Sequence, residues 1–125
     1  FFTILKALVD NRREVVLIVN DEKSGTFESC SLFAKAKLKE LDKGSKGKFK
    51  YYFFNSKLHG GKILHAKLVV VDRKIALIGS ANISKKALSL NYEIMLKVSG
   101  EYAVSRLSLM LDNLVKMLED ESNAN

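Results

Sequence analysis

The order of apolar and polar positions predicts alternating helices and strands along the first half of the chain. Apolar residues recur at helical spacing in residues 4–13 and 28–41. Runs of β-branched and aromatic residues, typical of buried strands, fill residues 14–20 and 48–54. In the second predicted helix we expect four residues to face the core: Leu32, Phe33, Ala36 and Leu38.

The pattern of the second half of the chain predicts a hairpin, a further strand and a closing helix. Predicted strands at residues 65–72 and 75–80 lie so close together that only a hairpin can join them. A strand is expected at residues 91–98 and a helix at 101–119, whose apolar stripe consists of Leu107, Leu111, Leu114 and Leu118. This order predicts an α/β protein, a mixed β-sheet with helices on both faces.

The hairpin brings polar side chains together at one end of the predicted sheet. If Arg73 and Lys74 form a two-residue loop, facing residues have numbers that sum to 147. Lys67 then lies opposite Ser80, and His65 lies opposite Asn82. An ammonium and a carboxamide can donate to phosphate oxygens, and a histidine can attack phosphorus or transfer protons. Asp72 falls at the hairpin tip, far from this cluster.

Composition and charge narrow the class of protein. The chain has 125 residues, 47% of them hydrophobic, and we expect one globular domain over residues 1–125. Its 21 Lys and Arg against 14 Asp and Glu give a net charge of +7, which favours a polyanionic partner. A single cysteine excludes an internal disulfide, no Cys/His spacing suggests a metal, and the short apolar runs exclude a membrane-spanning helix.

The polar cluster belongs to a longer pattern with fixed spacing. His65, Lys67, Asp72, Gly79, Ser80 and Asn82 complete H-x-K-x(4)-D-x(6)-G-S-x-N, and Glu93 follows eleven residues after the pattern ends. This pattern resembles the signature of the phospholipase D superfamily, in particular its small endonucleases with a single motif. The family also has a strand and a helix ahead of residue 1, so we expect this chain to lack the amino-terminal part of the domain.

The resemblance implies a metal-independent and cofactor-free phosphodiesterase that works through a phosphohistidine. Two motif copies form such a site, so a homodimer or the second half of a longer chain is expected. His65 would attack phosphorus in one copy and protonate the leaving oxygen in the other. Lys67 and Asn82 would bind phosphate oxygens, Ser80 would support the pocket and Glu93 would orient the imidazole. Asp72 and Gly79 would act as scaffold residues.

The net charge and the short chain favour a nuclease among the enzymes of this family. The candidate nucleic-acid surface consists of Lys35, Lys39, Lys43, Lys46 and Lys48, which aromatic residues follow. An ordinary solvated lysine face is the other interpretation. DNA is expected rather than RNA, without a membrane partner, in the cytoplasm. Two alternatives stay open: half of a phospholipase or phosphatidyltransferase, and a non-catalytic DNA-binding module with this fold.

Overall fold

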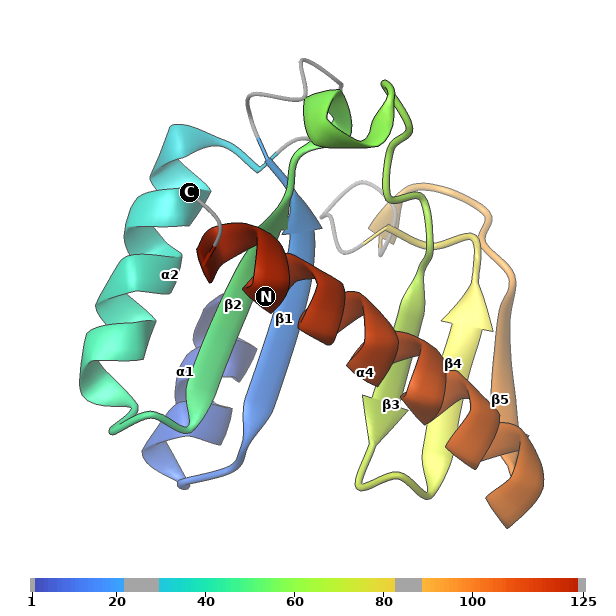
Figure 1. Cartoon of the computed structure of the whole chain (residues 1–125). Helices are drawn as coiled ribbons and strands as arrows, with labels where there is room; N and C mark the ends of the chain where they lie inside the picture. Colours follow the sequence, from blue (N-terminus) through green and yellow to red (C-terminus); the bar gives the residue numbers. More distant parts are fainter. Residues whose placement is uncertain (1, 22–29, 83–88, 124–125) are drawn as a thin grey trace. The chain divides into compact units, whose positions relative to one another are not determined.

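The computed structural model describes residues 2–21, 30–82 and 89–123 (Figure 1). The chain divides into two compact units, Phe1–Leu64 and His65–Asn125. The first contains a parallel pair of strands and the second an antiparallel sheet of three strands. The α/β class is therefore confirmed, with the parallel and antiparallel pairing in two separate sheets where one mixed sheet was predicted. The assignment of residues 1–125 to one domain stays a prediction.

The first unit packs two helices on one face of a parallel strand pair. Strand β1 (Val15–Asn20) runs beside β2 (Phe49–Phe54), with Val15 opposite Phe49 and Asn20 opposite Phe54. Helices α1 (Phe2–Asp10) and α2 (Leu32–Gly44) cover the face that carries Phe49. The core of this unit is formed by Leu5, Val9, Leu38 and Phe49, which are at most 8% exposed.

Helix α2 begins later than predicted and buries a different stripe. Ser31 caps it, because the Ser31 Oγ accepts a hydrogen bond from the amide of Ala34 at 3.2 Å. Leu38 is 1% exposed, as expected, but the prediction that Leu32 and Phe33 face the core is wrong, since they are 72% and 69% exposed. Ala36 is exposed as well. At 3.6 residues per turn, all three point about 120° or more away from Leu38.

A short 3-10 helix, η2 (Ser56–His59), follows β2. The Asn55 side chain caps it by accepting from the amide of Lys57 at 3.1 Å. Gly60 ends it with a φ of 63°, a conformation that favours glycine. The His59 ring stacks on Phe54 with a centroid distance of 4.3 Å, so this histidine packs in the first unit rather than extending into solvent.

The second unit is a three-stranded antiparallel sheet covered by the closing helix. Strands β3 (Leu68–Val71), β4 (Ile75–Gly79) and β5 (Met95–Ser99) lie in this order, and α4 (Glu101–Asn123) crosses them (Figure 1). Leu118 is buried and the other three predicted stripe leucines are half-buried, which confirms the stripe. Val104 and Ser108 are buried on α4 as well. No helix in the described part of the chain is long and apolar enough to span a membrane.

The hairpin between β3 and β4 has a register one residue away from the prediction. Leu68 lies opposite Ile78 and Val71 opposite Ile75, so the loop contains three residues, Asp72 to Lys74. A two-residue hairpin loop needs a positive φ that Arg-Lys does not favour. In the three-residue loop, Asp72 and Arg73 take φ values of 52° and 54°, and the amide of Lys74 donates to the carbonyl of Val71 at 3.0 Å.

The corrected register changes which residues face one another. The amide of Gly79 donates to the carbonyl of Lys67 at 3.3 Å, so Lys67 is level with Gly79 and not with Ser80. The predicted pairs Lys67–Ser80 and His65–Asn82 are therefore wrong. Because side chains alternate between the faces of a strand, a shift of one residue also changes the face that each partner occupies.

Candidate functional site

Except for Asp72, the motif residues nevertheless gather at one end of the three-stranded sheet. His65 and Lys67 lead into β3, Ser80 and Asn82 follow β4, and Glu93 precedes β5. In an antiparallel sheet of this order, the start of β3, the end of β4 and the start of β5 lie at the same end (Figure 1). The topology, rather than the predicted cross-strand pairs, brings these segments together.

Ser80 joins the end of β4 to the segment that enters β5. Its amide donates to the carbonyl of Ile94 at 3.0 Å, and its Oγ accepts from the amide of Ile94 at 3.1 Å. The same hydroxyl donates to Oε2 of Glu93 at 2.5 Å. Ser80 therefore holds both the backbone and the carboxylate of the segment that enters β5, and its role in supporting a pocket stays a prediction.

Glu93 is half-buried and uses both carboxylate oxygens in hydrogen bonds. Oε2 accepts from Ser80, and Oε1 accepts from the Asn91 side-chain amide at 3.2 Å. The predicted contact of Glu93 with the imidazole stays a prediction. Asn91 was missed as a partner of the site, although its spacing of two residues from Glu93 could have suggested that the two side chains lie on one side of the chain.

Gly79 is required by the close approach of the chain entering β5. A Cβ atom at this position would lie 2.0 Å from the carbonyl oxygen of Ile94 and 2.9 Å from the Cα of Met95. Backbone atoms cannot yield to such a contact. The glycine of the motif therefore permits the pairing that places Ser80 beside Glu93.

His65 and Lys67 lie just before β3, which begins at Leu68 and not at residue 65 as predicted. His65 is exposed, and the half-buried Lys67 donates from its Nζ to the carbonyl of His65 at 2.9 Å. The ammonium is thus held beside the backbone of the histidine, where it could bind an oxygen of a phosphate that approaches the imidazole. Asn82 is exposed beyond the end of β4.

Asp72 lies at the opposite end of β3, in the hairpin loop. The next residue, Arg73, forms a bidentate ion pair with Asp112 of α4, with distances of 2.8 and 2.9 Å. The hydrogen bonds lower the pKa of Asp112 and raise that of Arg73, each from its ordinary value. This end of the sheet therefore contains a structural contact between hairpin and helix.

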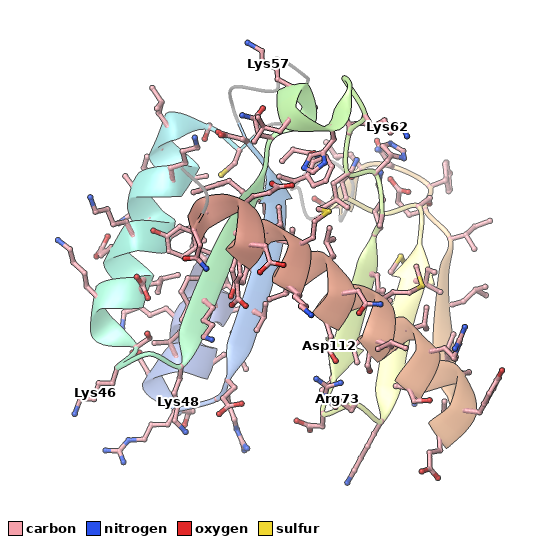
Figure 2. The ribbon with its side chains drawn as sticks, in the orientation of Figure 1. Lys46, Lys48, Lys57, Lys62, Arg73 and Asp112 are labelled. Carbon is pink, nitrogen blue, oxygen red and sulfur yellow. The ribbon has the colours of Figure 1, made fainter. Side chains whose placement is uncertain are left out.

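The predicted lysine surface is only partly available. Lys35 pairs with Asp21, and its Nζ lies 4.7 Å from the centroid of the Phe53 ring, so it takes part in internal packing. Lys39, Lys43, Lys46 and Lys48 are exposed. Figure 2 shows Lys46 and Lys48 close together at the end of the first unit where β2 begins.

Two arginines join this surface that the lysine run did not reveal. Arg12 and Arg13 precede β1, and the amide of Val15 donates to the carbonyl of Lys48 at 2.9 Å. The starts of both parallel strands are therefore adjacent, and we call Arg12, Arg13, Lys46 and Lys48 the basic edge. In the described ranges, no three or more His, Cys, Asp or Glu side chains are placed to hold a metal ion.

Comparison with known proteins gives relatives that are named for a phospholipid. Cardiolipin synthase A of Pseudomonas fluorescens (strain SBW25) is 42% identical over 48 residues, which are 38% of this chain and 10% of that protein. Cardiolipin synthase A of Pseudomonas aeruginosa (strain LESB58) is 39% identical over 49 residues, again 10% of its length. The match to the same enzyme of Wigglesworthia glossinidia brevipalpis is 30% over 73 residues, 52% of this chain and 15% of the relative.

These matches cover only a small part of each relative, but the family comparison extends over most of the chain. The model of the family described as "Cardiolipin synthase, PLD-like domain" matches residues 1–115, a range that includes every motif residue and the sheet end where they gather. The chain therefore belongs to the phospholipase D superfamily, through its family of PLD-like domains.

Proposed function

We propose that this chain provides half of the active site of a phosphatidyl-transferring phosphodiesterase with His65 as the nucleophile. The observation that supports the proposal is that the motif residues other than Asp72 lie at one end of the three-stranded sheet. There Ser80 is hydrogen-bonded to Glu93, and Lys67 is hydrogen-bonded to the backbone of His65. Relatives named cardiolipin synthase A support a phospholipid substrate over the nucleic acid that net charge alone favoured.

The proposed reaction has two displacements at phosphorus. In the first, a ring nitrogen of His65 forms a bond to phosphorus, and the bond to the leaving oxygen breaks as a second histidine protonates that oxygen. In the second, an acceptor alcohol or water attacks phosphorus and passes its proton to the second histidine, and the bond to His65 breaks. Lys67 and Asn82 hold the non-bridging oxygens and stabilise the charge that develops on them.

A second motif copy is part of this proposal, because one chain contains one such histidine. A homodimer or another half of a longer polypeptide would supply the proton donor. In the second case the other motif lies in a part of the polypeptide outside this chain. Each arrangement places two histidines with complementary protonation states on either side of one phosphate.

The charge distribution keeps nucleic acid as a second candidate substrate beside anionic lipid. Residues 1–64 contain 13 Lys and Arg against 7 Asp and Glu, whereas residues 65–125 contain 8 against 7. The excess is therefore concentrated in the unit that carries the basic edge. Phosphates of nucleic acid and of anionic lipid attract such a surface alike.

The decisive experiment offers both kinds of phosphodiester to the same protein. Vesicles of phosphatidylglycerol in phosphatidylcholine, single- and double-stranded DNA, and RNA are each incubated with the wild type and with His65→Asn. We expect phosphatidyl transfer or release that needs His65, and intact nucleic acids. Cleavage of DNA or RNA that needs His65 would establish the nuclease instead. No turnover of any substrate by an assembly that contains both motif copies would favour the non-catalytic module.

A further inference from the structure

The last residue of β1 holds the backbone just ahead of His65. Asn20 is 5% exposed, and its side-chain Nδ2 donates to the carbonyl of Leu64 at 2.8 Å. The amide of Leu64 donates back to the Asn20 Oδ1 at 2.9 Å. One buried carboxamide therefore satisfies both backbone polar groups of Leu64, as a neighbouring strand would.

Asn20 is itself held firmly. It lies opposite Phe54 in the parallel ladder, and its carbonyl accepts from the amide of Cys30 at 2.8 Å. Asn20 is buried, so water has little access to its side chain. The loss of either side-chain hydrogen bond therefore leaves a backbone group of Leu64 without that partner. The Asn20 side chain therefore anchors the backbone of Leu64 through hydrogen bonds.

This attachment acts on His65 through a single peptide group. The carbonyl of Leu64 and the amide nitrogen and Cα of His65 lie in one plane, because the peptide bond between them is planar. The bond is trans, since the described residues contain no cis peptide. Fixing the Leu64 oxygen thus fixes the plane from which the His65 side chain departs.

We propose that Asn20 is a positioning residue for His65, an inference that rests on the proposed function of that histidine. In-line attack on phosphorus needs the ring nitrogen within a fraction of an ångström of one location, and a misplacement of about 1 Å can cost about a hundredfold in rate. By holding the peptide plane, Asn20 limits the positions that the Cα atom of His65, and with it the imidazole, can take. It touches neither the substrate nor the imidazole in this role.

The chemistry of the side chain fits this role closely. A carboxamide offers an N–H donor and a C=O acceptor side by side, which matches the C=O and N–H of one residue. A carboxylate has no donor for the Leu64 carbonyl and would place a negative charge against it. Alanine has neither group, and the serine hydroxyl is too short to reach both.

Kinetics on a small substrate separates positioning from lipid binding. The assembled protein is tested with bis(4-nitrophenyl) phosphate as wild type, Asn20→Ala and Asn20→Ser. The matched control is Ser45→Ala, which removes another buried polar side chain of the same unit, one that bonds to Asp42 and Gly47. We expect kcat to fall about tenfold or more in both Asn20 variants with KM within about twofold, and both constants to stay within about twofold in Ser45→Ala. An equal effect on kcat in Ser45→Ala and the Asn20 variants would overturn the proposal.

A measurement that does not depend on turnover tests this inference separately from the proposed function. The ring resonances of His65, assigned by their loss in His65→Asn, and the hydrogen exchange of the Leu64 amide are followed by NMR. Asn20→Ala should shift or broaden the ring signals and speed the exchange about tenfold or more, and Ser45→Ala should do neither. Unchanged ring signals overturn positioning. Changed signals in a protein that cleaves no phosphodiester overturn the proposed function alone.

Discussion

The Ser80 hydroxyl donates to Oε2 of Glu93 at 2.5 Å, across the gap between the end of β4 and the start of β5. The same oxygen accepts from the amide of Ile94, so the Ser80 side chain holds both the backbone and a carboxylate of the segment that enters β5. These contacts connect two parts of the sequence that lie thirteen residues apart. The arrangement of the site therefore depends on how closely β4 and β5 approach each other.

Gly79→Ala should disrupt this approach. The added methyl would lie 2.0 Å from the carbonyl oxygen of Ile94, so β4 and β5 must separate and Ser80 must lose its position beside Glu93. We expect the free energy of unfolding to fall by about 2 kcal/mol or more, with loss of turnover. Chemical denaturation and activity assays measure the two effects.

Gly44→Ala is the matched control, because nothing lies within 4 Å of a Cβ at that position at the end of α2. Its stability should stay close to that of the wild type or rise slightly, since alanine favours a helix over glycine. Equal stability losses in the two variants would contradict the steric explanation for Gly79.

His65→Ala and His65→Asn should abolish turnover while the fold survives, because His65 is exposed and its removal leaves no cavity. Lys67→Ala should lower the rate by about a hundredfold, since a donor to a transferring phosphoryl group contributes on the order of 3 kcal/mol. Quenching during turnover and mass spectrometry should detect the transferred phosphatidyl group, bound through phosphorus, on the peptide with His65. His59→Gln is the control and should keep this label, whereas a label found on His59 would contradict the assignment.

Turnover should persist in excess EDTA. The resemblance to the family implies charge stabilisation by Lys67 and Asn82, and no group of three metal-ligating side chains occurs in the described ranges. Initial rates before and after dialysis against the chelator should agree within about twofold, if cationic side chains stabilise the charge that develops. Activity that disappears and returns only with magnesium would require another mechanism.

The ion pair between Arg73 and Asp112 should stabilise the fold only above the titration range of the carboxyl. The pKa of Asp112 is lowered by the hydrogen bonds from Arg73, so its contribution is fully present above the ordinary pKa of aspartate. It is lost as the pH falls through the lower pKa of the folded state. Asp112→Asn should therefore lower the Tm slightly at pH 7 and leave it unchanged near pH 2, by calorimetry.

Asp120→Asn provides the comparison for this pair, because Asp120 is an exposed carboxylate on the same helix. It should not change the Tm at either pH. A Tm difference for Asp112→Asn that stays constant down to pH 2 would show that the carboxamide affects packing and not the ion pair. The small expected size follows from the exposure of both side chains.

The basic edge should determine binding to anionic surfaces. Lys46→Ala with Lys48→Ala should weaken binding to phosphatidylglycerol vesicles by about thirtyfold, at about 1 kcal/mol for each lysine near the surface. Lys57→Ala with Lys62→Ala removes the same charge at the other end of the first unit (Figure 2) and should have a smaller effect. Co-sedimentation at low salt measures both, and equal losses would show that net charge alone matters.

The local pattern of the sequence was sufficient to predict the α/β class and most of the elements. Strands β1, β2 and β4 and the closing helix lie where apolar runs and leucine spacing placed them, because burial leaves a local pattern of apolar residues in the sequence. Strand β3 begins at Leu68, three residues later than predicted. The fifth strand, β5, begins at Met95, four residues later than predicted. The fixed spacing from His65 to Asn82 likewise identified the superfamily without any knowledge of contacts.

Contacts between distant segments needed the tertiary structure. The hairpin register depended on Asp72 and Arg73 adopting positive φ, which the local pattern does not encode. Phe33 points outward because a different stripe of α2 packs against Phe49. Lys35 pairs with Asp21 because the fold brings α2 beside the residue that follows β1. The bonds from Asn20 to Leu64 join residues 44 positions apart, and only the folded backbone brings a carboxamide to the peptide that carries His65.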